Sequence, residues 1–359
     1  MRVPHNKLYD ESKILYEIYR MRGLTVNQMV EVMFQSKWYA YRYLRNLEEQ
    51  GLLSYIYDTE GRKRVAKVYV CTDVAIERLE KEGYIEKGVK AKDNTPHKAK
   101  LKYTILTNEV YAALTPYGIH MYDSREWKRR YGMDRNSMVR GGLRMADGRE
   151  IGLYLFFSKK QYKDADFSRK MLERFKREIE KFPQSNRIAV ICYDEATYDE
   201  LIEEFEKDDK PLSKEELLII PIGKDNFGYN LLRMNRSEIE RKAVLEQILN
   251  ARLLKEHAAL KGNRQLFAQY IADYSDREMY VVDFLSLNRP IIRNLITHYF
   301  DRAFEIDGRQ VNLVCWNVNK EMDRLYGKLI RYPHVNIVPI PTKTLAETYI
   351  SKIEKTKLI

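Results

Sequence analysis

Residues 35–55 read QSKWYAYRYLRNLEEQGLLSY, a short helical stretch that leads into a strand. Ala40, Leu44 and Leu47 fall at i, i+4 and i+7, so one face of the expected helix is apolar and packs on a core. The remaining surface is basic and aromatic, and it carries Lys37, Trp38, Tyr41, Arg42 and Arg45. A helix that only covers a core has no need of such an outer face, which is typical of contact with a large anionic surface.

The segments around this helix indicate the motif to which it belongs. Residues 10–23 and 24–34 each predict a helix, with Asp10 and Thr25 as the expected N-caps. After the quoted helix come two strand-like runs, LLSYIY and RVAKVYVCT, joined by the turn DTEGRK. A further helix, DVAIERLEKEG, follows. Three helices and a hairpin in this order predict a winged helix-turn-helix over residues 1–87.

In such a domain the third helix presents its outer face to the major groove of DNA. We therefore predict DNA contacts from the five outer residues of the helix, and from Arg62, Lys63 and Arg64 at the hairpin tip. An alternative stays open, because winged helices also serve as protein–protein modules. In that case Trp38 would pack on a partner.

Positive charge is concentrated in a second place along the chain. The 359 residues carry a formal net charge of +11, and residues 125–149 contain eight Lys and Arg against three Asp and Glu. Local basic runs indicate phosphate contact better than the total charge does. We predict contacts to a DNA backbone from Lys128, Arg129, Arg130, Arg140 and Arg144.

Composition favours a cytoplasmic protein without a membrane partner. No apolar run approaches the ~20 residues that a membrane span needs, and residues 1–13 lack the apolar core of a signal peptide. The three cysteines are far apart in sequence, which is typical of a reducing compartment rather than of disulfides or a zinc site.

The rest of the chain predicts α+β or α/β architecture. Residues 88–100 are polar, rich in lysine and interrupted by proline, which predicts a linker. Strands and helices then alternate in an α/β domain over residues 101–235, and a long helix plus a second α/β unit are expected over residues 236–359. The strands that begin at 151, 188 and 217 match those that begin at 279, 311 and 336. We interpret them as two similar β-α-β-α-β units from an internal duplication, although buried parallel strands can also converge on one pattern.

The long helix is expected from Ser237 to Leu260, with an apolar stripe formed by Leu245, Ile248, Leu249 and Leu253. This stripe faces either the α/β core, which is the favoured reading, or a second copy of the chain. We expect a homodimer by this or another surface, because two winged helices with matched spacing bind DNA more tightly than one.

Two stretches resemble the replication-relaxation family of plasmid and mobile-element proteins. They are LTVNQMVEVMFQSKWYAYRYLRNLEEQGLL and, further on, LTNEVYAAL followed by SREWKRR. The resemblance covers roughly the first half of the chain. It implies a role in replication or transfer of a plasmid-like element, and an α/β part similar to the PD-(D/E)xK nuclease fold, often without an intact site.

That nuclease fold holds Mg²⁺ with an Asp on one strand and an acid-x-Lys on the next. The corresponding hairpin here would be MVRGGLRMADGREIGLYLFFSKK. Gly141 and Gly142 stand where the Asp is expected, and the acid-x-Lys is replaced by Leu155, Phe156 and Phe157. We therefore predict a nuclease-like fold without catalysis, metal or cofactor.

The nearest carboxylates, Asp147 and Glu150, are expected at the hairpin turn, where they cap or solvate it. Glu126-Trp127-Lys128 matches the acid-x-Lys pattern in sequence only, and we interpret it as an exposed salt-bridging stretch. The sequence contains no P-loop, no G-x-G-x-x-G and no His-x-His, but its 27 tyrosines leave a nucleophilic tyrosine open.

These observations favour a sequence-specific double-stranded DNA-binding protein of a plasmid or mobile element. It would act without catalysis in replication initiation, transfer or transcriptional control, with the replication or transfer machinery as a further partner. The alternatives are a DNA-nicking or cleaving enzyme of plasmid replication or conjugation, and a winged-helix interaction scaffold.

Overall fold

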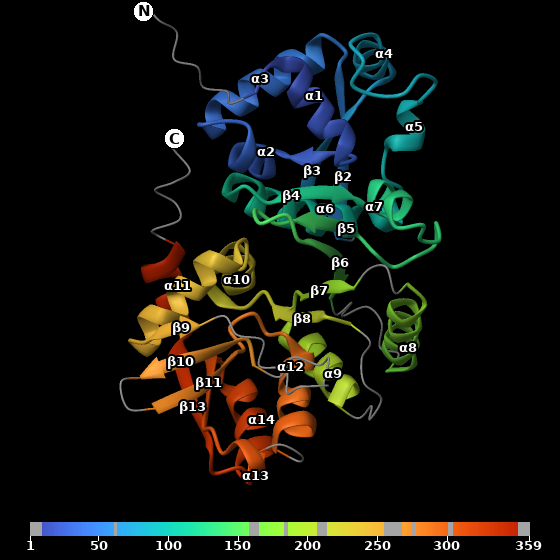
Figure 1. Cartoon of the computed structure of the whole chain (residues 1–359). Coiled ribbons are helices and arrows are strands. Elements are labelled where there is room, and N and C mark those ends of the chain that lie inside the picture. Colours follow the sequence, from blue (N-terminus) through green and yellow to red (C-terminus); the bar gives the residue numbers. More distant parts are fainter. Residues whose placement is uncertain are drawn as a thin grey trace, which may run out of the picture. The chain divides into compact units, whose positions relative to one another are not determined.

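The computed structural model describes residues 9–60, 63–157, 165–182, 186–206, 214–254, 268–274, 277–300 and 304–350 (Figure 1). The chain is a mixed α and β protein with several sheets, in agreement with the coarse fold class predicted from the sequence. It divides into two compact units, Met1–Asp123 and Ser124–Ile359. This division differs from the predicted boundaries at residues 87, 100 and 235.

The first unit is built mainly from helices and one small sheet. Its elements are α1 (Glu11–Arg20), β1 (Leu24–Thr25), α2 (Val26–Val32), α3 (Lys37–Glu49), β2 (Leu53–Glu60), β3 (Lys63–Cys71), α4 (Asp73–Lys81), α5 (Ala91–Asn94), α6 (Lys98–Leu114), a 3₁₀ turn at Thr115–Tyr117 and β4 (His120–Asp123).

The local signals that begin these helices act as predicted. The Asp10 side chain accepts a hydrogen bond from the backbone N–H of Lys13 at 2.8 Å, and so caps α1. Thr25 and Gln28 form a reciprocal capping box at the start of α2. The hairpin is present as antiparallel β2 and β3, and β1 adds a third strand to it by pairing with β3.

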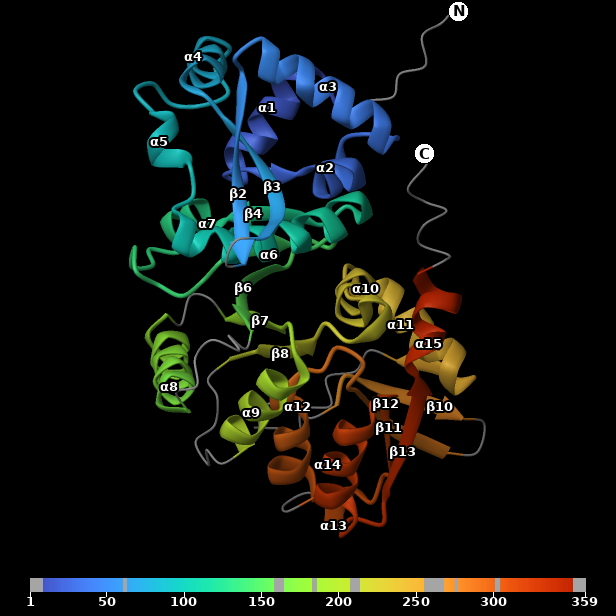
Figure 2. The same cartoon turned by 180° about the vertical axis from the view of Figure 1, so that it is seen from behind.

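Helix α6 is part of the first unit, although its residues were expected in a linker and an α/β domain. Leu101 and Ile105 of α6 form a buried cluster with Val68 and Val70 of the hairpin. Figure 2 shows the hairpin lying across this helix. The Asn108 side-chain amide donates to the backbone oxygen of Met21 at 3.1 Å and thereby also fixes α6 to the turn after α1.

The second unit contains two sheets with helices around them. Its elements are α7 (Ser124–Arg130), β5 (Gly141–Arg144), β6 (Glu150–Phe156), α8 (Ala165–Lys181), β7 (Arg187–Cys192), α9 (Glu195–Glu206), β8 (Glu216–Pro221), a 3₁₀ turn at Lys224–Asn226, α10 (Phe227–Met234), α11 (Glu238–Leu249), β9 (Arg252–Leu254), β10 (Tyr270–Tyr274), β11 (Arg277–Asp283), α12 (Arg289–Asn294), a π-helical turn at Leu295–Phe300, α13 (Phe304–Asp307), β12 (Val311–Asn317), α14 (Asn319–Leu329), β13 (Val335–Pro341), α15 (Thr342–Thr344) and a π-helical turn at Leu345–Ile350.

The two sheets of this unit follow the same succession of strands. In the first sheet, β5 pairs antiparallel with β6, and β6, β7 and β8 are parallel neighbours. In the second sheet, β10 pairs antiparallel with β11, and β11, β12 and β13 are parallel neighbours, with β9 on the far side of β10. Each strand predicted from the sequence begins within two residues of its observed start. We refer to these parts as the first half and the second half of the unit.

The predicted long helix is wrong beyond Leu249. Asn250 adopts a left-handed conformation (φ 47°) and ends α11, after which Leu253 pairs with Ala272 in the second sheet. Residues 255–260, the end of the expected helix, lie outside the described residues. Leu245 and Leu253 are buried in the unit, as the core reading of the stripe predicted, whereas Ile248 and Leu249 are only half-buried.

Helix α9 of the first half lies beside α14 of the second, and charged pairs join them. Arg324 donates to Asp199 at 2.9 Å, and Lys328 donates to Glu206 at 2.7 Å. At the centre of this contact the buried Glu321 accepts hydrogen bonds from Arg289 at 2.6 Å and from the Tyr198 hydroxyl at 2.8 Å. Burial alone would raise the pKa of Glu321, but the charge and hydrogen bonds of Arg289 outweigh this effect and lower it.

We expect Glu321→Gln to lower the free energy of unfolding by about 3 kcal/mol at neutral pH, because it leaves the Arg289 charge buried without a counter-charge. The folded-state pKa of Glu321 lies below the unfolded value, so its contribution is present above about pH 4.3 and is lost as the pH falls through the folded pKa. The variant should therefore lose less stability on acidification than the parent does. Urea unfolding at neutral and acidic pH measures both effects.

Glu206→Gln is the matched control. Its partner Lys328 is partly exposed, and pairs of this kind contribute about 0–1 kcal/mol. Equal losses in the two variants would contradict a central role for Glu321.

Candidate nucleic-acid interface

The outer face of α3 is arranged as the sequence predicted. Ala40, Leu44 and Leu47 are fully buried, whereas Trp38 is 69% exposed and Tyr41 is 50% exposed. The three cations of the predicted face are also exposed: Lys37, Arg42 and Arg45. The helix therefore presents two aromatic rings and three positive charges to solvent, which is an unusual surface for a helix that only packs on a core.

The cations on this face differ in whether they are paired with a carboxylate. Near its start, Arg42 lies over the Trp38 ring at 5.7 Å from the centroid, and neither Arg42 nor Lys37 forms an ion pair with any described residue. Near its end, Arg45 donates to Glu49 at 3.0 Å. The cations available to an anionic partner are therefore concentrated in the first half of α3.

The hairpin continues this surface with a face of its own. Tyr55 and Tyr57 of β2 lie on the same side as Lys67 of β3, and the Lys67 Nζ is 3.9 Å from the centroid of the Tyr55 ring. Lys67 also forms an ion pair with Glu48 of α3 at 2.7 Å, which joins the two elements. The sequence analysis missed these three residues, although their alternation with Ile56 and Val68 could have identified them.

The tip of the hairpin is only partly described. Lys63 and Arg64 are exposed, and the Arg64 guanidinium lies 4.3 Å from the centroid of the Tyr57 ring. Arg62, the third residue predicted to contact DNA at the tip, lies outside the described residues.

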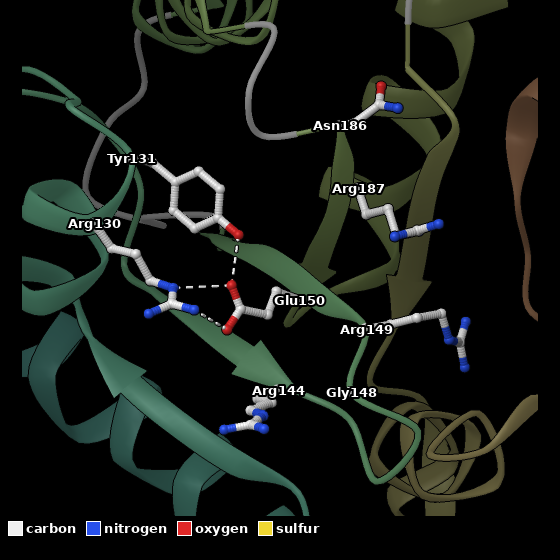
Figure 3. Close-up of a pocket in the computed structure, with 8 residues that line it drawn as sticks. All are labelled: Arg130, Tyr131, Arg144, Gly148, Arg149, Glu150, Asn186 and Arg187. Atoms are coloured by element: carbon white, nitrogen blue, oxygen red, sulfur yellow. Dashed lines mark hydrogen bonds and ion pairs between the residues drawn. The ribbon is translucent and has the colours of Figure 1, made fainter.

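The second unit holds a polar pocket of about 380 Å³ with four arginines in its wall (Figure 3). Glu150 lies near its centre and accepts hydrogen bonds from Arg130 at 2.8 and 2.9 Å and from the Tyr131 hydroxyl at 2.7 Å. Arg144 is exposed and stands opposite Glu150 in the register of β5 and β6. The side chains of Arg149 and Arg187 extend away from Glu150, as Figure 3 shows.

This pocket brings together part of the basic run predicted from the sequence. Arg130 and Arg144 line it, whereas Lys128, Arg129 and Arg140 do not. Lys128 instead donates to the backbone oxygen of Arg135 at 3.0 Å. Arg187 was missed because it comes from β7, and only the pairing of β7 with β6 places it beside residues of the hairpin.

The position at which the resembled nuclease fold carries its Asp is filled by a tryptophan ring. A Cβ added to Gly142 would overlap the ring of Trp127, which is 1% exposed. The predicted exposed stretch at residues 126–128 is therefore wrong for Trp127. Leu155 and Phe156, at the acid-x-Lys positions, are also buried. These apolar residues do not fit a metal ion, and no group of three His, Cys, Asp or Glu in the described ranges could hold one.

Asp147 and Glu150, the nearest carboxylates, are engaged in structural contacts. Asp147 accepts from the Arg149 side chain at 2.8 Å and from the backbone N–H of Glu238 at 3.0 Å, at the start of α11. Burial would raise the pKa of Asp147, but its hydrogen bonds and the charge of Arg149 lower it. Asp147 thus fastens the turn to the next helix, in agreement with its expected capping role.

The class that these features define is a mixed α/β protein with a cationic, aromatic surface formed by a helix and a hairpin. A family model described as Replication-relaxation matches residues 15–181, in agreement with the resemblance found in the sequence. No curated protein and no solved structure matches the chain. Within the described residues, no helix has the length and apolar character to cross a membrane.

We expect Gly142→Ala to lower the free energy of unfolding by about 3 kcal/mol, because the added methyl group forces Trp127 out of its packed position. Chemical denaturation measures the loss. The same substitution should cost clearly less in a Trp127→Leu background, where the smaller side chain leaves space. An undiminished cost in that background would show that the glycine is needed for another reason.

Proposed function

We propose that the chain binds double-stranded DNA at a specific sequence through α3 and the β2–β3 hairpin. The biological role that we infer is replication, transfer or transcriptional control of a plasmid or mobile element. The observation that carries the proposal is the division of α3 into a fully buried apolar face and an exposed face of aromatic and positively charged side chains. The family name supports a role related to replication.

The order of elements supports the interpretation of the first unit as a winged helix-turn-helix. Helices α1, α2 and α3 precede a two-stranded hairpin, and the short β1 pairs with β3 beside them. In this type of domain the third helix enters the major groove, and the hairpin contacts the neighbouring backbone. We assign base contacts to the outer residues of α3, and backbone contacts to Lys63, Arg64 and Lys67.

The second unit supports the proposal less directly. Arg130 and Arg144 at the pocket in Figure 3 are exposed cations that suit the phosphates of a DNA backbone. The common succession of strands in the two halves supports their origin by duplication. A homodimer that presents two copies of α3 would bind a repeated DNA site, and it remains a proposal.

We expect Arg42→Ala to weaken binding to a selected DNA site much more than binding to a scrambled duplex. A bidentate contact between arginine and a base contributes about 1–3 kcal/mol of discrimination, which a phosphate contact does not provide. Lys63→Ala should weaken both interactions about equally and flatten the salt dependence by about one unit of slope. Fluorescence anisotropy at several salt concentrations measures both.

Lys81→Ala is the control, because Lys81 is an exposed lysine of α4 away from the proposed surface. Unchanged DNA binding by the triple variant Lys37→Ala, Arg42→Ala and Arg45→Ala would overturn the proposal.

We also propose that the chain acts without nuclease catalysis, because the positions of the expected metal ligands are occupied by Gly142, Leu155 and Phe156. Supercoiled plasmid carrying the selected site should stay intact with Mg²⁺ or Mn²⁺, while binding is retained. Nicking that disappears in Glu150→Ala would show a metal site at the hairpin. Nicking that leaves the protein covalently attached to DNA would instead identify a tyrosine nucleophile.

A further inference from the structure

A second, larger cavity of about 890 Å³ lies within the second unit, where its two halves meet. We call it the joint cavity. Its wall is formed by the beginnings of β7 and β8, by α9 from the first half, and by α12 and α14 from the second half. Its size falls within the range of about 300–1,000 Å³ that is usual for pockets that bind small molecules.

One part of this wall is apolar. Ile202 and Phe205 of α9, Ile291 and Ile292 of α12, and Leu325 of α14 contribute to it. Apolar and aromatic side chains are the usual lining around the carbon skeleton of a ligand. A simple inorganic ion would leave this part of the wall without a partner.

The other part of the wall is strongly cationic. The joint cavity is lined by nine lysine and arginine residues against five glutamates. At least six of these nine cations form ion pairs with carboxylates, some of which also line the cavity: Arg149, Arg187, Arg241, Arg289, Arg324 and Lys328. Lys214 is 5% exposed and donates to the backbone oxygen of Phe182 at 2.8 Å, and burial lowers its pKa.

Several buried N–H groups of the lining arginines have unused hydrogen-bonding capacity. Arg187 Nε, Arg289 Nε and Arg324 Nη1 make no hydrogen bond in the described parts of the chain, although Arg187 Nε lies 4.0 Å from Glu216 and Arg324 Nη1 lies 3.9 Å from Glu321. Buried donors are normally satisfied, because an unpaired one costs folding free energy. These atoms have no surface open to the cavity in this conformation, so the side chains must turn before acceptor oxygens of a ligand can reach them.

Gly327 is an exposed glycine in this wall, with open space beside its backbone. It lies inside α14 and lines the cavity, and a Cβ added there would meet nothing within 4 Å. A glycine inside a helix destabilises it relative to alanine, and no neighbour requires glycine at this position. Close approach of a ligand to the backbone is a common reason for such a glycine.

We propose that the joint cavity binds a small organic phosphate of the nucleotide class, with its phosphates against the arginines and its base against the apolar wall. Planar guanidinium groups match the several oxygens of a phosphate better than they match a single halide or hydroxyl. Because the wall comes from both halves, the ligand bridges them and stabilises the unit. This proposal is independent of DNA binding by the first unit.

Calorimetric titration of the full chain with ATP in EDTA tests the proposal, together with the thermal unfolding midpoint. ATP should bind and raise the midpoint, because a ligand that binds only the folded state stabilises it. Adenosine, which lacks the phosphates, and pyrophosphate, which lacks the base, should each bind at least about tenfold more weakly. Absence of ATP binding, or equal affinity for ATP and pyrophosphate, would overturn the proposal.

Two variants locate the site. Gly327→Leu places a side chain in the cavity at a helical position that accepts it, so it should abolish ATP binding without lowering the unfolding midpoint. Arg187→Gln should weaken binding about tenfold through loss of a charged donor. Arg144→Gln is the control, because Arg144 lines only the pocket in Figure 3. Parent-like ATP binding by Gly327→Leu would exclude the joint cavity as the site.

Discussion

The arrangement of the second unit depends on a buried carboxylate. Glu321 of α14 is 2% exposed, and only the paired charge of Arg289 and the hydroxyl of Tyr198 make an ionised group tolerable there. Since Tyr198 belongs to the first half and the other two residues belong to the second, the interaction is satisfied only when the halves meet in one orientation. That orientation places α9, α12 and α14 around the joint cavity, so the ion pair that orders the unit also shapes this cavity.

The fold of the first unit depends more on local sequence signals than the fold of the second unit does. It was therefore predicted more accurately from the sequence. The caps at Asp10 and Thr25, the apolar stripe of α3 and the hairpin follow from residues a few positions apart, whose interactions need no knowledge of the fold. The placement of α6 could not be predicted in this way, because it depends on contacts between Leu101 and Val68 and on the hydrogen bond from Asn108 to Met21. The same limit explains the predicted helix beyond Leu249, since only pairing with β10 favours a strand there.

The candidate sites show the same contrast. The exposed residues of α3 could be predicted from helical periodicity. Arg187 reaches the arginine pocket only through strand pairing, so the sequence alone could not identify it. Gly141 and Gly142 stand where the resembled nuclease fold carries an Asp. The structure explains why position 142 requires glycine. The ring of Trp127 occupies the space that a side chain at Gly142 would need, so recovery of a metal ligand by a single substitution is blocked sterically.

If the chain binds DNA as proposed, the pairs formed by Glu48 with Lys67 and by Glu49 with Arg45 would affect its motion along DNA. Two carboxylates among the cations reduce the attraction to every phosphate, whatever the base sequence nearby. A DNA-binding protein with this surface would dissociate sooner from incorrect positions, and its residence time at any position would depend more on base contacts than on charge. In the proposed DNA-bound state, the same glutamates would weaken binding to phosphates and thereby shorten the search for a target among many similar sites.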